Sequence, residues 1–123
     1  MAACIAGSGG VSGAPTLSTH VLDLVSGKPA AGVTIELWRS GERLFSGDTN
    51  ADGRCPELAA LVLPSGAYRV TFAISAYFRN QGAVLADPPF LDVVPIDFAM
   101  AETGHYHVPL LASPFGYSTY RGS

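Results

Sequence analysis

With 123 residues, the chain is the size of one domain built around one hydrophobic core. Apolar residues make up 48% of it and charged residues only 14%, well below the usual quarter or so, which suggests that another copy of the chain covers part of the surface. The net charge of −3, the scattered Lys and Arg residues and the lack of any apolar run of about 18 residues argue against nucleic-acid binding and against a membrane span.

The chain begins with a stretch rich in Gly, Ser and Ala, residues that have little capacity to pack. We therefore predict a flexible leader at residues 1–15 and one folded domain at residues 16–123. The leader lacks the basic and apolar regions of a secretory signal, so the predicted location is the cytoplasm.

From Leu17 onward, short segments rich in β-branched and aromatic residues alternate with turn-forming residues, which is typical of an antiparallel β-sandwich. The predicted strands are Leu17–Leu24, Val33–Arg39, Arg43–Thr49, Ala67–Ala73, Leu91–Ala99, Gly104–Leu111 and Gly116–Arg121. The pattern also leaves open a short strand after Arg54. The segment Ser75–Gly82 has no alternation and predicts a short helix that ends at Gly82.

The segment HYHVPLLASPFGYSTYRGS, from His105 to Ser123, gathers several chemically active side chains. As a strand, its first part turns alternate side chains to opposite faces, with His105, His107, Pro109 and Leu111 on one and Tyr106, Val108 and Leu110 on the other. The Ser-Pro-Phe-Gly group predicts a turn, so a hairpin would bring His107 close to the final Tyr-Arg-Gly-Ser.

The residues alone leave more than one role open for each candidate. His20 would stand on a half-exposed strand face, although imidazole can exchange a proton near neutral pH. Arg54 follows the turn-like Asn50–Gly53 and would ordinarily be solvated. The spacing of His105 and His107 suits either a metal site or a simple exposed pair, and His20 is the only other histidine.

The terminal hairpin resembles the C-terminus of the 5-hydroxyisourate hydrolases, the enzymatic members of the transthyretin family, which ends in YRGS. Other stretches resemble the same family in the same order: LSTHVLDLVSGKPAAGV (Leu17–Val33), DTNADGRC (Asp48–Cys55), GAYRVTF (Gly66–Phe72), the Tyr77-Phe78 pair and PPFLDVVPIDF (Pro88–Phe98). Short motifs scarcely match in this number and order by chance.

The resemblance implies an all-β, transthyretin-like (prealbumin-like) sandwich of two sheets and about eight strands, with one short helix. It implies hydrolysis of 5-hydroxyisourate at a cyclic amide, giving 2-oxo-4-hydroxy-4-carboxy-5-ureidoimidazoline in urate degradation, with no metal and no cofactor. It also implies a homotetramer, a dimer of dimers, with paired sites in a channel between the dimers. The strand face that carries His107, Pro109 and Leu111 would line this channel.

The roles of individual residues follow from the same resemblance. His20 and His107 would activate and orient a water, one of them as general base, while Arg54 would polarise the attacked carbonyl or hold the substrate. Tyr120, Gly122 and Ser123 would form the rest of the substrate site. His105 would support the site without reacting, and Arg121 could instead tie down the tail by pairing with an acidic neighbour.

Two other functions remain to be separated from this one. A binding module on the same fold, like the hormone-carrying transthyretin branch, would lack the His, Arg, His and YRGS set that this chain has. A metal-dependent amidohydrolase would use the His-x-His pair as ligands.

Overall fold

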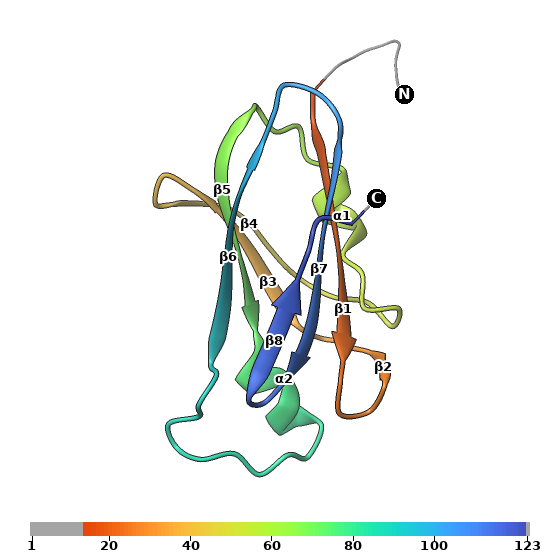
Figure 1. The fold of residues 1–123 in the computed structure, drawn as a ribbon, viewed down its shortest axis with the longest axis vertical. Helices are drawn as coiled ribbons and strands as arrows, with labels where there is room; N and C mark the ends of the chain where they lie inside the picture. Colours follow the sequence, from red (N-terminus) through yellow and green to blue (C-terminus); the bar gives the residue numbers. More distant parts are fainter. Residues whose placement is uncertain (1–13, 123) are drawn as a thin grey trace.

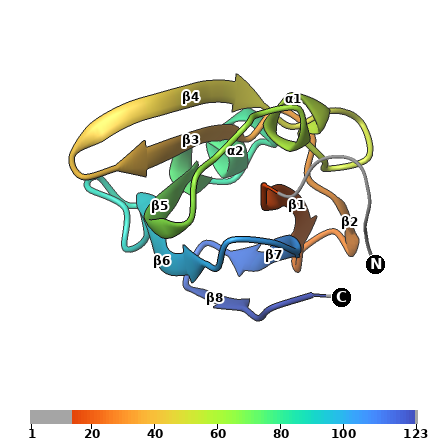
Figure 2. The ribbon, with the colours of Figure 1, turned by 90° about the horizontal axis from the view of Figure 1, so that it is seen from above.

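The computed structural model describes residues 14–122, which form two four-stranded sheets packed face to face (Figures 1 and 2). The predicted leader at residues 1–15 lies almost wholly outside the described residues, as does Ser123. One sheet has the order β2-β1-β7-β8 and the other the order β4-β3-β5-β6. The predicted transthyretin-like architecture of two sheets and eight strands is thus confirmed.

The strands follow the alternation of the sequence closely. The first sheet contains β1 (Thr16–Asp23), β2 (Lys28–Pro29), β7 (His105–Ser113) and β8 (Gly116–Thr119); the second contains β3 (Thr34–Arg39), β4 (Glu42–Asp48), β5 (Gly66–Ala73) and β6 (Val93–Met100). Only the two-residue strand β2 was not predicted, since it is too short to show an alternation.

Residues 14–122 contain two short helices where one was predicted. The expected one is α2 (Ile74–Asn80), which ends two residues before Gly82. The other, α1 (Pro56–Ala59), occupies the region where the sequence left open a short strand after Arg54. Pro56 stands at its start, where the missing N–H costs nothing, and Leu58 is buried in the core. The alternation of a strand needs more residues than this segment has.

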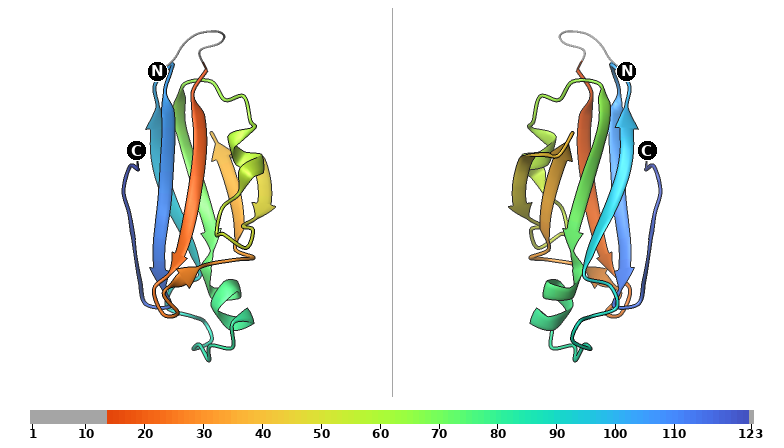
Figure 3. Two further views of the ribbon diagram at one scale, coloured as in Figure 1. Left: turned by 90° about the vertical axis from the view of Figure 1, so that its right-hand side faces the viewer. Right: turned by 90° about the vertical axis from the view of Figure 1, so that its left-hand side faces the viewer.

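The antiparallel arrangement predicted from the sequence holds for every pair of strands in the described residues except one. β1 and β7 run parallel along their whole length, side by side in Figure 3. Parallel pairing requires a long crossover connection, and here the chain between the two strands builds the entire opposite sheet. The parallel register sets Ser18 beside His107 and His20 beside Pro109.

The inner faces of the two sheets enclose a single core. The first sheet contributes Leu17 and Val21 from β1 and Val108, Leu110 and Ala112 from β7, all of them buried. Tyr106 packs partly buried against the same core, so the predicted division of β7 into two faces is confirmed. Pro109 differs from the other residues of the outer face because it is buried, although the alternation assigns it to that face.

A buried polar pair closes one end of the sandwich. The Tyr77 hydroxyl of α2 donates a hydrogen bond of 2.8 Å to Asp23 Oδ2, while the N–H groups of Val25 and Ser26 donate to Asp23 Oδ1. Burial alone would raise the pKa of Asp23, but these hydrogen bonds outweigh it and hold the pKa below 3.8. Burial and the neighbouring carboxylate raise the pKa of Tyr77 to about 12.

Among residues 14–122, no helix has the length and apolar character needed to cross a membrane.

Candidate active site

Four of the predicted site residues meet on the outer face of the β2-β1-β7-β8 sheet. An isolated antiparallel β-bridge joins His20 to Arg54, and a second joins His107 to Gly122. Because β1 and β7 are neighbours in this sheet, the two bridged pairs lie next to one another. Residues from three distant parts of the sequence therefore share one surface.

Arg54 reaches His20 because a tight turn brings its backbone against β1. Asn50 Oδ1 accepts hydrogen bonds from the N–H groups of Asp52 and Arg54, which holds the turn together. Gly53 adopts φ +75°, and a Cβ there would lie 2.5 Å from the carbonyl oxygen of Val21. Glycine is thus required for the close approach in which Val21 N–H donates to Gly53 O at 2.8 Å. The Arg54 side chain that follows is exposed.

His107 is held in a chain of hydrogen-bonded side chains. Its Nδ1 lies 2.7 Å from Ser18 Oγ, which also lies 2.9 Å from Nε2 of His105. The other ring nitrogen of His105, Nδ1, lies 2.7 Å from Thr16 Oγ1. Burial lowers the pKa of His107 from its ordinary value of 6.5, and the charges of Arg54, His105 and His20 lower it further. These effects favour the neutral imidazole of His107.

The end of the chain crosses directly over His107. Gly122 N–H donates to the carbonyl oxygen of His107 at 2.8 Å, and a Cβ at Gly122 would lie 2.4 Å from His107 Cδ2. Glycine was predicted here because the chain would pass close to another group, and that group is the ring of His107. The Arg121 guanidinium lies 4.3 Å from the centre of the Tyr106 ring, so an aromatic face holds it where an acidic partner was considered. Tyr120 is exposed, and Ser123 lies outside the described residues.

Ser18 and Thr16 are the residues of this face that the sequence did not single out. The signal was present, because Ser18 lies two residues before His20 in a strand and so shares its face. What the sequence could not show is that β7 lies alongside in parallel register. Within the described part of the chain, no three His, Cys, Asp or Glu side chains gather as a metal-binding group.

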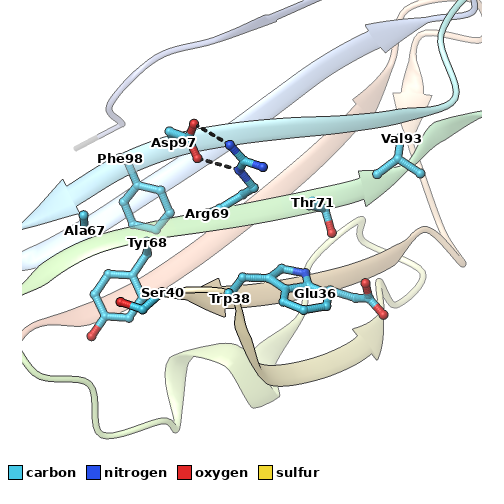
Figure 4. Close-up of a pocket in the computed structure, with 11 residues that line it drawn as sticks. Glu36, Trp38, Ser40, Ala67, Tyr68, Arg69, Thr71, Val93, Asp97 and Phe98 are labelled. Carbon is cyan, nitrogen blue, oxygen red and sulfur yellow. Dashed lines mark hydrogen bonds and ion pairs between the residues drawn. The ribbon is translucent and has the colours of Figure 1, made fainter.

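An open hollow of about 710 Å³ lies elsewhere, on the outer face of the β4-β3-β5-β6 sheet (Figure 4). Trp38, Tyr68 and Phe98 line it beside the ion pair of Arg69 and Asp97. It includes none of the predicted site residues. On the site face, His20 and His107 are half-buried and Arg54 is exposed.

Comparisons with known proteins identify the family of the chain. Residues 17–122 match the HIUase/Transthyretin family. The chain is 55% identical over 113 residues to a 5-hydroxyisourate hydrolase of Mesorhizobium japonicum, covering 87% of this chain and 91% of the relative.

Among solved structures, 5-hydroxyisourate hydrolase of Klebsiella pneumoniae superimposes with a TM-score of 0.78 at 43% identity, covering 89% of this chain and 94% of that one. Sea bream transthyretin, solved in complex with thyroxine, gives a TM-score of 0.75 at 33% identity, covering 87% of this chain and 94% of that one. The resemblance seen in the motifs is confirmed, and the chain belongs to the HIUase/transthyretin family.

Proposed function

We propose that the chain hydrolyses 5-hydroxyisourate to 2-oxo-4-hydroxy-4-carboxy-5-ureidoimidazoline without a metal. That it is an enzyme of the hydrolase branch is confirmed by its relatives, several of which are named 5-hydroxyisourate hydrolase at 46–55% identity. The observation that carries the finer proposal is the convergence of His20, Arg54 and His107 on one sheet face. A carrier of hydrophobic ligands has no need for two imidazoles beside a guanidinium.

The geometry supports a mechanism by activated water. His107, kept neutral by its lowered pKa, takes a proton from water as the water oxygen attacks the amide carbonyl carbon. Arg54, with up to five N–H donors, stabilises the oxyanion that forms on the carbonyl oxygen. As the intermediate collapses, the ring C–N bond breaks and the leaving nitrogen receives the proton from His107. His20, bridged to Arg54 by the backbone, orients the water.

A metal-dependent reaction through His105 and His107 fits the contacts less well. Both nitrogens of His105 and one nitrogen of His107 already contact the hydroxyls of Thr16 and Ser18. A metal bound by both histidines would need a nitrogen lone pair from each ring on the same side of the strand. Hydrogen bonds to Thr16 or Ser18 would therefore have to break first.

We further propose that the enzyme works in the cytoplasm as a homotetramer, a dimer of dimers that completes the site. Four exposed apolar side chains lie toward the end of the site-bearing sheet where β1 and β7 finish: Leu24, Val25, Phe115 and Tyr117. Leu24 N–H donates to Ala112 O at 2.9 Å, which ties the segment after β1 to the end of β7. A patch of this kind suits contact with another copy of the chain, which would enclose the site face in a channel.

The test is the ultraviolet decay of freshly generated 5-hydroxyisourate, made in place by urate oxidase. We expect wild type to accelerate the decay, and His107→Ala and Arg54→Ala to lose most of that acceleration. Arg43→Ala is a matched control, since Arg43 is an exposed strand arginine paired with Glu36 on the other sheet.

Activity that survives a chelator, in protein free of metal by elemental analysis, would support the metal-free route. Loss of activity on chelation, restored by one metal, would favour the metal-dependent alternative. If correctly assembled wild type gives no acceleration, the carrier function becomes the better interpretation.

A further inference from the structure

Two residues next to the proposed base have no part in the mechanism above. Ser18 is half-buried on β1 and His105 is exposed on β7, and both belong to the hydrogen-bonded chain that ends on His107 Nδ1. The resemblance to the family gave Ser18 no role and left His105 as a supporting residue. Their contacts with each other and with His107 restrict where the protons of the two rings can lie.

The contacts restrict one another because each member has limited hydrogens to give. The Ser18 hydroxyl has one hydrogen and two lone pairs, so it can donate to at most one of the rings of His105 and His107 and can accept from one or both. A neutral imidazole has one N–H donor and one lone-pair acceptor. The proton position on one ring therefore restricts the proton position on the other.

Three proton arrangements satisfy these contacts with neutral rings. In the first, His107 Nδ1–H donates to Ser18, the Ser18 hydroxyl donates to His105 Nε2, and His105 Nδ1–H donates to Thr16. In the second, every donor and acceptor is exchanged, and the proton of His107 sits on Nε2. In the third, His107 Nδ1–H and His105 Nε2–H both donate to Ser18, and the Thr16 hydroxyl donates to His105 Nδ1. The first and third arrangements leave Nε2 of His107 with a lone pair that can accept a proton.

We propose that Ser18 and His105 are positioning residues that hold His107 as the Nδ1–H tautomer, with Nε2 free to act as the base. The catalytic role of this tautomer rests on the proposed function, whereas the tautomer itself is a property of the protein without substrate. Gly122 fixes the ring from another side, because its backbone packs against Cδ2, the carbon next to Nε2. The imidazole is thus held at Nδ1 by a hydroxyl and beside Nε2 by the chain end.

Holding the ring by a hydroxyl differs from holding it by a carboxylate. A carboxylate partner would favour the charged imidazolium and raise the pKa of the histidine. Here the neutral Ser18 hydroxyl orients the ring without adding charge, while burial and the nearby charge of Arg54 favour the neutral base. Orientation and charge state of His107 are therefore set by different groups.

The tautomer can be measured directly in the assembled full chain, without substrate, by long-range ¹⁵N–¹H correlation spectra of labelled histidine. We expect wild-type His107 to carry its proton on Nδ1. Ser18→Ala should shift it toward the Nε2–H form, and Ser18→Thr, which keeps a hydroxyl, should restore the wild-type signal. Ser46→Ala is the matched control, because Ser46 is an exposed strand serine on the opposite sheet.

Kinetics separate positioning from a structural role. General-base catalysis contributes roughly 10²- to 10⁴-fold, so partial loss of the correct tautomer in Ser18→Ala should lower kcat about 10- to 100-fold. A residue that acts only through His107 should leave KM nearly unchanged. His105→Phe removes the next link from an exposed position and should lower kcat in the same direction, which provides a second variant if Ser18→Ala folds poorly.

A wild-type His107 that carries its proton on Nε2 would overturn the inference, as would a Ser18→Ala variant with unchanged tautomer and kcat. Failure of wild type to hydrolyse 5-hydroxyisourate would overturn the proposed function instead. The spectrum of the free protein would still decide the tautomer, so the two failures can be told apart.

Discussion

Replacing Gly122 by alanine should damage catalysis far more than it damages the fold. A Cβ at this position would lie 2.4 Å from His107 Cδ2 and 3.0 Å from Cγ, whereas ordinary contact begins at 3.4 Å. The ring of His107 or the terminal segment must therefore move by about 1 Å. A displacement of about 1 Å in an active site can cost on the order of 10²-fold in rate, or about 2.7 kcal/mol of transition-state stabilisation.

The expected effect on stability is smaller. The contact at stake is one backbone hydrogen bond, from Gly122 N–H to His107 O, and such a bond contributes about 0.5–1.5 kcal/mol. The core residues Val108 and Leu110 lie on the opposite face of β7 and need not move. We therefore expect kcat/KM for 5-hydroxyisourate to fall about 100-fold, with a free energy of unfolding close to that of wild type.

The assay compares Gly122→Ala with Gly116→Ala, measuring both kcat/KM and urea unfolding. Gly116 is the appropriate control because a Cβ there meets no atom within 4 Å and its φ is not in the left-handed region. Wild-type kcat/KM in Gly122→Ala would refute the reasoning, since it would mean that the tail does not press on the His107 ring. Equal losses in both variants would point to a general effect of the hairpin.

Burial is the main cause of the lowered pKa of His107, and the positive charge of Arg54 lowers this pKa further. Arg54→Gln should therefore raise the pKa of His107 and move its NMR titration to higher pH. A titration at the wild-type pH would contradict this prediction. Tyr77→Phe removes the 2.8 Å hydrogen bond to buried Asp23 and should cost roughly 1.5–3 kcal/mol. The ionised Asp23 stabilises the fold above pH 3.8, and this stabilisation is lost as the pH falls and the carboxylate is protonated. Because the variant has a higher Asp23 pKa, urea unfolding should show this loss at a higher pH than in wild type. An unchanged dependence of stability on acid pH would argue against the Tyr77–Asp23 hydrogen bond. Leu111→Trp, on the face proposed to line the channel, should impair both tetramer formation in sedimentation experiments and activity. Normal assembly would count against the proposed channel.

The strands were predictable because their alternation is strong and local. In β1, buried and less buried residues alternate without a break from Thr16 to Asp23, and each predicted strand ends within two residues of the observed one. The helix α1 was missed because four residues are too few to show a period, although Pro56 at its first position was a usable signal. Where the signal is a period, short elements are lost.

The site was only partly predictable, for a different reason. The motifs indicated His20, Arg54, His107 and the tail, and the structure brings His20 to Arg54 and His107 to Gly122. The contact between Ser18 and His107 could not be foreseen, since it depends on a parallel pairing of strands whose residues lie 89 positions apart. No local pattern encodes which distant strand becomes the neighbour or in which direction it runs.

The parallel pairing of β1 with β7 also determines at which stage of synthesis and folding the proposed site can form. During synthesis β1 leaves the ribosome long before β7, so its apolar residues Leu17 and Val21 must wait for most of the chain to be made. Contacts of such long range close late and slow the folding of β proteins. Until residues 105–122 have joined β1, the residues of the proposed site cannot come together. The proposed site can therefore assemble only after translation has passed β8 and β1 has paired with β7.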